Sequence, residues 1–115
     1  REIPSPGPGQ VLLRMKAGSL NYRDTIVVKN QYGAPTSRPI VPLSDGCGEV
    51  VEVGPGVGRV KVGDRVVMYI VLVDGADRYT ERGRENLSGR RTTMSYHHDG
   101  AFARRMVVPA LGVTN

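Results

Sequence analysis

The chain is poor in the residue types that support disulfide, membrane or stacking chemistry. It has 115 residues, a single cysteine (Cys47), no tryptophan and 5% aromatic residues. One cysteine excludes an intrachain disulfide and fits a reducing compartment, so we expect a cytoplasmic protein. No apolar run approaches the roughly 20 residues of a membrane helix. The chain opens on Arg1 without an initiating methionine or a signal peptide, and we expect residues upstream of it to be missing.

Acidic residues are the scarcer charge. Lys and Arg number 16 against 11 Asp and Glu, which gives a net charge of +5. Such a balance can attract nucleic acid or an anionic membrane, or a phosphorylated cofactor. The few aromatics are not interleaved with the basic residues, and the densest basic run, 78–91, also carries Glu81 and Glu85. We therefore expect neither a nucleic-acid nor a membrane partner.

Glycine and proline divide the chain into short apolar segments. The 15 Gly and 8 Pro residues are spread along the sequence, which is typical of turns between strands. The polar stretch 74–99 lacks periodicity and is predicted to be a loop or insertion. Asn21 is the expected N-cap of a helix over 21–29, with Asp24 in its first turn. Residues 1–115 are expected to form one mainly β domain. Strands are predicted over 11–16, 46–53, 65–73 and 101–108, with turns at 54–58 and 60–64.

Several tempting motifs fail on chemical grounds. In the glycine cluster 54–58 the third glycine comes one residue early for a dinucleotide loop, and a strand rather than a helix follows, so a β-turn is predicted. Cys47 lies between two glycines in an apolar strand, which indicates a small buried core residue. Ser19 and Ser44 have no assignable His–Asp partners, so a hydrolase triad is unsupported.

Three segments in order carry a family resemblance. They are residues 17–24 (AGSLNYRD), 43–54 (LSDGCGEVVEVG) and 61–67 (KVGDRVV). Together they resemble the N-terminal, GroES-like (alcohol dehydrogenase-like) catalytic domain of the medium-chain dehydrogenase/reductases. The resemblance implies a partly open β-barrel with a short helix. It also implies that the family's C-terminal nucleotide-binding Rossmann domain is absent from residues 1–115, so this fragment alone is expected to bind no dinucleotide.

The resemblance bears on zinc. In zinc-dependent members a Cys opens the segment that here begins at Asn21, and a His-Glu pair stands where this chain has Ser44-Asp45. Zinc prefers thiolate, imidazole or carboxylate ligands, whereas Asn and Ser are poor ones. The structural zinc lobe of the family needs four cysteines, and 74–99 contains none. The adjacent His97 and His98 point apart in an extended chain and are predicted to be solvated loop residues.

We therefore predict no zinc at either of these sites. The motifs resemble the zinc-independent branch of the family, the quinone oxidoreductase and enoyl reductase-like members. In that branch the position of Asn21 lines the active-site cleft near the nicotinamide, and an aromatic near Tyr32 borders the substrate. The resemblance thus implies Asn21 and Tyr32 as catalytic residues and Asn21 and Tyr22 as cofactor-binding residues. An amide can orient a carbonyl, and a phenol can polarise one. The structural alternatives, a helix cap for Asn21 and a half-buried packing residue for Tyr32, stay open.

The implied activity belongs to a full-length parent. It is the NAD(P)H-dependent reduction of a small quinone, enone or related carbonyl substrate, with NADPH as the expected cofactor. The expected partner is the Rossmann domain, and the parent is compatible with a homodimer. Because a fold alone does not determine function, the alternative is a stand-alone GroES-like binding or interaction module without enzymatic activity.

Overall fold

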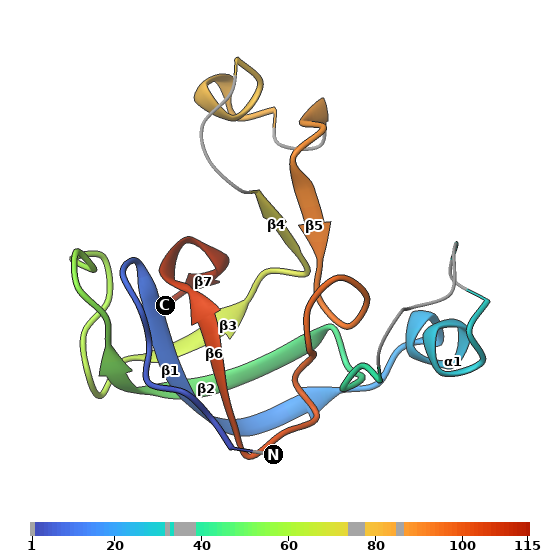
Figure 1. The fold of residues 1–115 in the computed structure, drawn as a ribbon, viewed down its shortest axis with the longest axis horizontal. Coiled ribbons are helices and arrows are strands. Elements are labelled where there is room, and N and C mark those ends of the chain that lie inside the picture. The colour runs from blue at the N-terminus through green and yellow to red at the C-terminus, as the bar shows by residue number, and fades with distance from the viewer. Residues whose placement is uncertain (1, 32, 34–38, 74–77, 85–86) are drawn as a thin grey trace.

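Five antiparallel strands curl into a partly open barrel, and a two-stranded arm projects from it (Figure 1). The structure is a computed structural model and describes residues 2–31, 33, 39–73, 78–84 and 87–115. The main sheet has the order β6-β1-β2-β3-β7, and β4 pairs with β5 in the arm. The predicted mainly β barrel with one short helix is confirmed. The elements are β1 (Gln10–Ser19), α1 (Tyr22–Val28), β2 (Asp45–Val53), β3 (Arg65–Met68), β4 (Val71–Val73), η1 (Thr80–Arg82), β5 (Arg91–Thr93), β6 (Arg105–Pro109), η3 (Ala110–Gly112) and β7 (Val113–Thr114).

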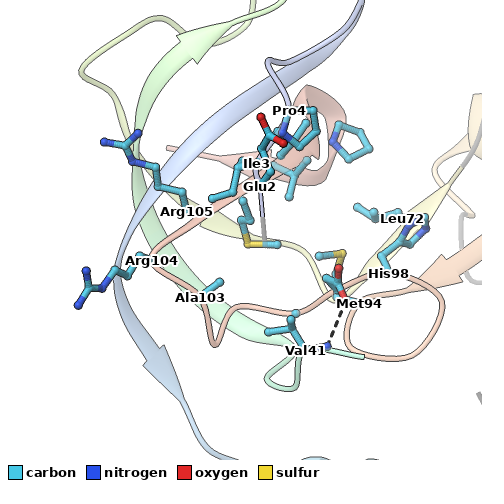
Figure 2. A pocket seen from close by; sticks show the side chains of 16 residues that line it. Glu2, Ile3, Pro4, Val41, Leu72, Met94, His98, Ala103, Arg104 and Arg105 are labelled. Carbon is cyan, nitrogen blue, oxygen red and sulfur yellow. Dashed lines mark hydrogen bonds between the residues drawn. The ribbon is translucent and has the colours of Figure 1, made fainter. Parts of the chain in front are cut away.

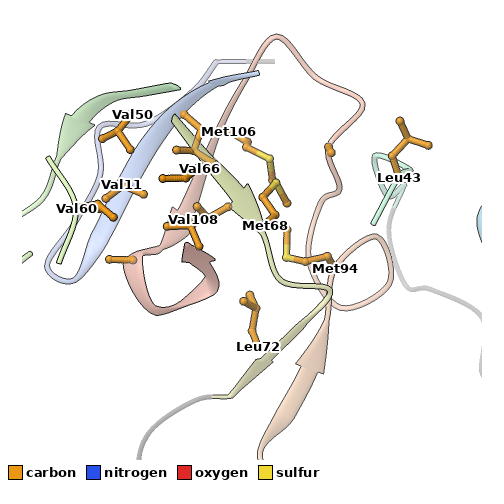
Figure 3. Packing of buried hydrophobic residues seen from close by; sticks show 14 residues of the cluster. Val11, Leu43, Val50, Val60, Val66, Met68, Leu72, Met94, Met106 and Val108 are labelled. Atoms are coloured by element: carbon orange, nitrogen blue, oxygen red, sulfur yellow. The ribbon is translucent and has the colours of Figure 1, made fainter. Parts of the chain in front are cut away.

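Alternation along the strands directs one set of side chains into the barrel. Val11 and Leu13 of β1 are fully buried, as is Val50 of β2. Their i, i+2 spacing places them on the same face of the pleated sheet. Figure 3 shows Val11 and Val50 gathered with the valines and methionines of the neighbouring strands, and Leu13 belongs to the same cluster. Leu72 and Met94 extend the cluster to the base of the arm. The core therefore lies on the inner face of the curl, and the outer face carries the polar side chains.

The long pairing of β1 with β2 positions the end of one strand beside the start of the other. β1 continues past its predicted end at residue 16, because Ala17 to Ser19 pair with Cys47 to Asp45. A register shift between Met15 and Ala17 accommodates this continuation. As a result, the loop that leads into α1 starts directly beside the first residue of β2.

Three predicted elements were wrong in detail. The strand predicted over 65–73 is two strands, because the chain leaves the main sheet at residues 69–70. There, Tyr69 N donates to Gly112 O and Ile70 O accepts from Met94 N, both at 2.9 Å. The stretch 74–99, predicted to be a loop, contributes β5 and η1, with residues 74–77 and 85–86 outside the described part. The last predicted strand, 101–108, begins only at Arg105.

The inner positions of β2 are glycines because close packing leaves no room there for a side chain. This determines the face of the sheet on which Cys47 lies. A Cβ on Gly46 would come 2.5 Å from the Ala101 side chain, and one on Gly48 would come 2.9 Å from the Arg14 carbonyl oxygen. Neither position has room for a side chain. Cys47, between them, points to the opposite face and is partly exposed. The prediction of a buried core cysteine was therefore wrong, because strand alternation gives the inner positions to the glycines.

The glycine cluster 54–58 forms the predicted turn. Gly54 N donates to Gln10 O at 2.8 Å, and Gly56 has a φ of 78°, a conformation that glycine adopts without strain. The chain then reaches a second turn, where Lys61 hydrogen-bonds Asp64 and lowers the pKa of its carboxyl group. β3 follows rather than a helix, so this loop lacks the geometry of a dinucleotide site. Within the described residues no helix has the length and apolar character needed to cross a membrane.

Candidate functional site

The candidate site begins at the N-terminus of α1, where Asn21 caps the helix. The Oδ1 atom of Asn21 accepts from Arg23 N, and Asp24 Oδ2 accepts from Asn21 N, both at 2.9 Å. This reciprocal capping satisfies backbone donors that an uncapped helix leaves open. Asp24 is buried, at 5% exposure, by its place in the cap. The predicted N-cap role of Asn21 and the predicted structural role of Asp24 are both confirmed.

The amide nitrogen of Asn21 reaches across to the start of β2. It lies 2.5 Å from Asp45 Oδ2 and 3.4 Å from Ser44 Oγ. Ser44 is fully buried, and its Oγ lies 3.5 Å from Asp45 Oδ2. The two segments that carry the family resemblance thus meet in one amide–hydroxyl–carboxylate cluster. We call Asn21, Ser44 and Asp45 the amide cluster.

The orientation of the Asn21 amide is determined at both ends. Its oxygen faces a backbone N–H, and its nitrogen faces a carboxylate. A flipped amide would place oxygen against oxygen at Asp45 and an N–H against the Arg23 N–H, so only one orientation satisfies the network. One amide hydrogen is engaged by Asp45, while the other has only the long contact with Ser44. Asn21 can therefore donate one N–H to a ligand by giving up the long contact with Ser44, while its contacts with Arg23 N and Asp45 remain.

Asp45 brings negative charge to an open groove. Within the described residues no cation forms an ion pair with its carboxylate. The groove has a volume of about 370 Å³ and also contains Ser19, Cys47 and Val67 along its walls. It runs beside the amide cluster along the ends of β1, β2 and β3. The Asn21 amide donates a hydrogen bond to this carboxylate, and a hydrogen bond to a charged acceptor is stronger than one between neutral groups.

The residues around Asn21 are largely solvent-facing. Leu20 and Tyr22 are 82% and 80% exposed. They flank Asn21 and offer apolar and aromatic surface beside the amide cluster. The predicted cofactor role of Tyr22 stays a prediction. Tyr32 lies outside the described residues, and its predicted catalytic role is likewise untested.

Ser44 and Asp45 are the members of the cluster that sequence analysis missed. Both were weighed as replacements for zinc ligands, and Ser44 also as a hydrolase nucleophile. Their contact with Asn21 spans more than 20 positions of sequence. The family alignment of the two segments was the one signal that could have joined them.

A larger cavity of about 670 Å³ lies elsewhere, beside β6 (Figure 2). Its walls include the apolar side chains of Leu72, Met94 and Met106. Asp99 Oδ1 accepts from Val41 N at 3.1 Å at its edge, and His98 Nε2 is 2.7 Å from Thr92 Oγ1. No member of the amide cluster lines this cavity, and its Asp99 carboxylate holds the backbone of Val41. We therefore place the candidate site at the amide cluster.

Comparison with known proteins decides the family. The model of the alcohol dehydrogenase GroES-like domain matches residues 7–115. The chain belongs to this family. A zinc-type alcohol dehydrogenase-like protein of Schizosaccharomyces pombe is 40% identical over 114 residues, covering 95% of this chain and 30% of that protein. An L-threonine 3-dehydrogenase of Pyrococcus furiosus is 35% identical over 114 residues, covering 97% and 33%.

The fold agrees with that assignment. The crystal structure of an NAD-dependent alcohol dehydrogenase superposes with a TM-score of 0.91 at 34% identity, over 99% of this chain and 33% of that one. This GroES-like domain thus spans about a third of the length of the relatives it matches. The names of these relatives are those of alcohol and threonine dehydrogenases, so the assignment of this chain to the quinone oxidoreductase-like branch stays a proposal.

The residues of this GroES-like domain do not fit a zinc ion of the kind for which the zinc-type relative is named. At the positions where zinc-dependent members carry Cys and His-Glu, the domain has an amide, a hydroxyl and one carboxylate. The Asn21 nitrogen donates to Asp45, so it presents hydrogens rather than a lone pair to the site, and hydrogens repel a cation. Among the described residues no group of three or more His, Cys, Asp or Glu side chains converges as a metal site. Zinc requires several such ligands, and the amide cluster supplies one.

Proposed function

We propose that this domain is the substrate-side half of an NAD(P)H-dependent, zinc-independent oxidoreductase that reduces a quinone, an enone or a related carbonyl compound. The observation that carries the proposal is the Asn21 amide, held by the helix cap and by Asp45, with only a 3.4 Å contact to Ser44 to give up for a ligand. A reduced carbonyl gathers negative charge on oxygen, and a pre-oriented donor stabilises that charge. Zinc supplies this stabilisation in metal-dependent enzymes, and here an amide would replace it.

Each residue of the site has a role in this scheme. A bound nicotinamide would supply the hydride. Asn21 donates its N–H to the substrate oxygen, Asp45 keeps the amide from turning, and Ser44 fills the space behind both. The exposed side chains of Leu20 and Tyr22 offer apolar walls for planar rings, with Tyr22 on the cofactor side. Tyr32 is proposed as a second donor to the substrate oxygen.

The dinucleotide needs more than this domain. The turn at 54–58 cannot cradle a pyrophosphate, so we propose that a Rossmann domain beyond residues 1–115 holds it. NADPH is the proposed cofactor because its additional phosphate suits a chain of net charge +5. A cytoplasmic location and a homodimeric parent belong to the same proposal. The alternative of a stand-alone binding module has less support, since the relatives named above are dehydrogenases about three times as long.

The full-length parent tests the proposed reaction. We expect it to oxidise NADPH with a 1,4-quinone or an enone after exhaustive chelator treatment, and elemental analysis to find no stoichiometric zinc. The reverse assay, alcohol with NADP⁺, serves as the control. One tightly held zinc per chain, together with activity on alcohols alone, would refute the proposal.

Replacing Asn21 by serine in that parent tests the role of the amide. Serine still caps a helix but is too short to donate to the substrate, so turnover should fall tenfold or more, which is about 1.4 kcal/mol. Asp45→Asn tests the orienting role of the carboxylate. An asparagine at 45 can accept from or donate to the Asn21 amide, so it no longer fixes the orientation of that amide, and turnover should fall, though less than in Asn21→Ser. Assays well below both melting temperatures are needed, because Asn21→Ser also removes the contact with Asp45. Wild-type turnover in Asn21→Ser would take Asn21 out of the site.

A further inference from the structure

The outer face of the main sheet carries a row of charged residues that no sequence motif revealed. Arg14 on β1 is paired directly with Arg105 on β6 and, on its other side, with Glu49 on β2. Glu49 is in turn paired with Arg65 on β3. Directly paired residues of antiparallel strands share one face, so the four side chains form a row across four strands. Arg14, Lys16, Arg65 and Arg105, together with the exposed Arg104 in the bend that precedes β6, are called the basic face here.

The negative charge on this face is already engaged. Glu49 Oε2 lies 3.0 Å from Arg14 and 3.1 Å from Lys16, and these hydrogen bonds keep the pKa of Glu49 below its usual value. One ionised carboxylate thus serves two cations. Glu52, opposite Leu12, is the next acidic residue along β2.

Three guanidinium groups of the basic face have no acidic partner. Within the described residues, Arg65, Arg104 and Arg105 form no side-chain hydrogen bond or ion pair. Figure 2 shows Arg104 and Arg105 extending side by side away from the cavity. Arg104 O accepts from Met15 N at 2.9 Å, which continues the pairing of this segment along β1. The three arginines are therefore held at the surface by paired backbone, with their charged ends free.

This arrangement works against the stability of the sheet. Like charges directly opposite one another, as Arg14 and Arg105 are, destabilise a strand pair. A planar guanidinium group binds a carboxylate through two parallel hydrogen bonds. Arg105 on β6 and Arg65 on β3 stand three strand spacings apart, roughly 14 Å, so each can take a carboxylate of its own. We propose that the basic face docks an acidic surface of a partner protein, whose carboxylates pair with Arg65, Arg104 and Arg105.

Other occupants fit the face less well. A second copy would bring the same positive charges to it. A nucleic acid would bring an unbroken run of phosphates against Glu49 and Glu52, and the strand positions that form the row contain no aromatic side chain for stacking. A protein surface can instead place cations opposite these glutamates and carboxylates opposite the arginines. The face also lies on the outside of the curl, where it meets a partner surface without having to enclose it.

Two charge-matched triple variants of this chain test the proposal, with poly-L-glutamate as the probe. The first combines Arg65→Gln, Arg104→Gln and Arg105→Gln. The second combines Arg82→Gln, Arg84→Gln and Arg90→Gln, all exposed arginines away from the main sheet. Both remove three positive charges, so they differ only in where those charges lie. We expect the first to weaken binding about tenfold or more at physiological salt, and the second to weaken it much less.

Each contrary result overturns the proposal. Equal weakening in both triple variants would show that net charge alone drives binding. Duplex DNA, or vesicles containing phosphatidylserine, that bound more tightly than poly-L-glutamate and lost binding in the first variant alone would assign the face to those partners instead. Circular dichroism and melting curves of both variants establish that each is folded before binding is compared.

Discussion

Asn21→Asp should destabilise the fold by about 2–3 kcal/mol at neutral pH, on the order of two pKa units at 1.36 kcal/mol each. Aspartate caps a helix as well as asparagine does, so the bond from Arg23 N survives. The loss arises at the other end of the side chain. There a second carboxylate would face Asp45 Oδ2 in place of an amide nitrogen that now lies 2.5 Å away. Two carboxylates at such a distance cannot both ionise without strong repulsion.

The pH dependence of this variant has a definite sign. Repulsion raises the pKa of a carboxyl in the folded state above its unfolded value of about 3.9. The penalty is therefore absent below that pH, where the proton is bound in both states, and grows as the pH rises. The difference in melting temperature between Asn21→Asp and wild type should shrink as the pH is lowered toward 4. Thermal melts of both proteins across pH 4–8 measure it.

The swapped pair provides the control. Adding Asp45→Asn to Asn21→Asp restores one amide and one carboxylate with their polarity exchanged, and should recover most of the lost stability. If the double variant were no more stable than Asn21→Asp, the contact between Asn21 and Asp45 would not be what holds the two segments together.

Gly54→Ala should lower the free energy of unfolding by about 3 kcal/mol or more. This is the upper end of the range for overpacking substitutions, because here the backbone itself has to move. A Cβ at this position would lie 1.9 Å from the carbonyl oxygen of Gly7 and 3.0 Å from that of Gln10. Both atoms belong to the main chain, and Gly54 N itself donates to Gln10 O. No rotamer change can relieve such a clash. Urea denaturation of the variant and the wild type measures the loss.

Gly58→Ala is the matched control in the same turn. A Cβ there would meet nothing within 4 Å, and the backbone is not left-handed. This substitution should be neutral or stabilise the protein by about 0.4–1 kcal/mol through the unfolded chain. Equal destabilisation by both variants would mean that the turn tolerates no alanine anywhere, and that the clash with Gly7 is not the cause.

The parts of the fold that were predictable depend on short-range chemistry. The cap of α1 joins Asn21, Arg23 and Asp24 within one helical turn, so the residue types at fixed offsets in the sequence predict it. The turn at 54–58 depends on glycine conformations, and the buried faces of β1 and β2 depend on alternation. Each of these signals lies within a few residues of the element that it predicts. The strand β5 was missed because Arg91-Thr92-Thr93 has no apolar alternation, and its pairing with β4 is what makes it a strand.

By itself, the sequence determined the mainly β class, the capped helix, the turns and the family, because each follows from local spacing or from ordered motifs. Tertiary structure alone decided which residues meet. The β1–β2 register brings Asn21 to Ser44 and Asp45. Cys47 points outward because Gly46 and Gly48 occupy the inner side of β2. The pairings of β1 with β6 and β2, and of β2 with β3, align four charged residues in one row: Arg105, Arg14, Glu49 and Arg65. The physical reason is that a shift of one residue in strand pairing moves every side chain to the other face, and no local pattern specifies which partner lies opposite.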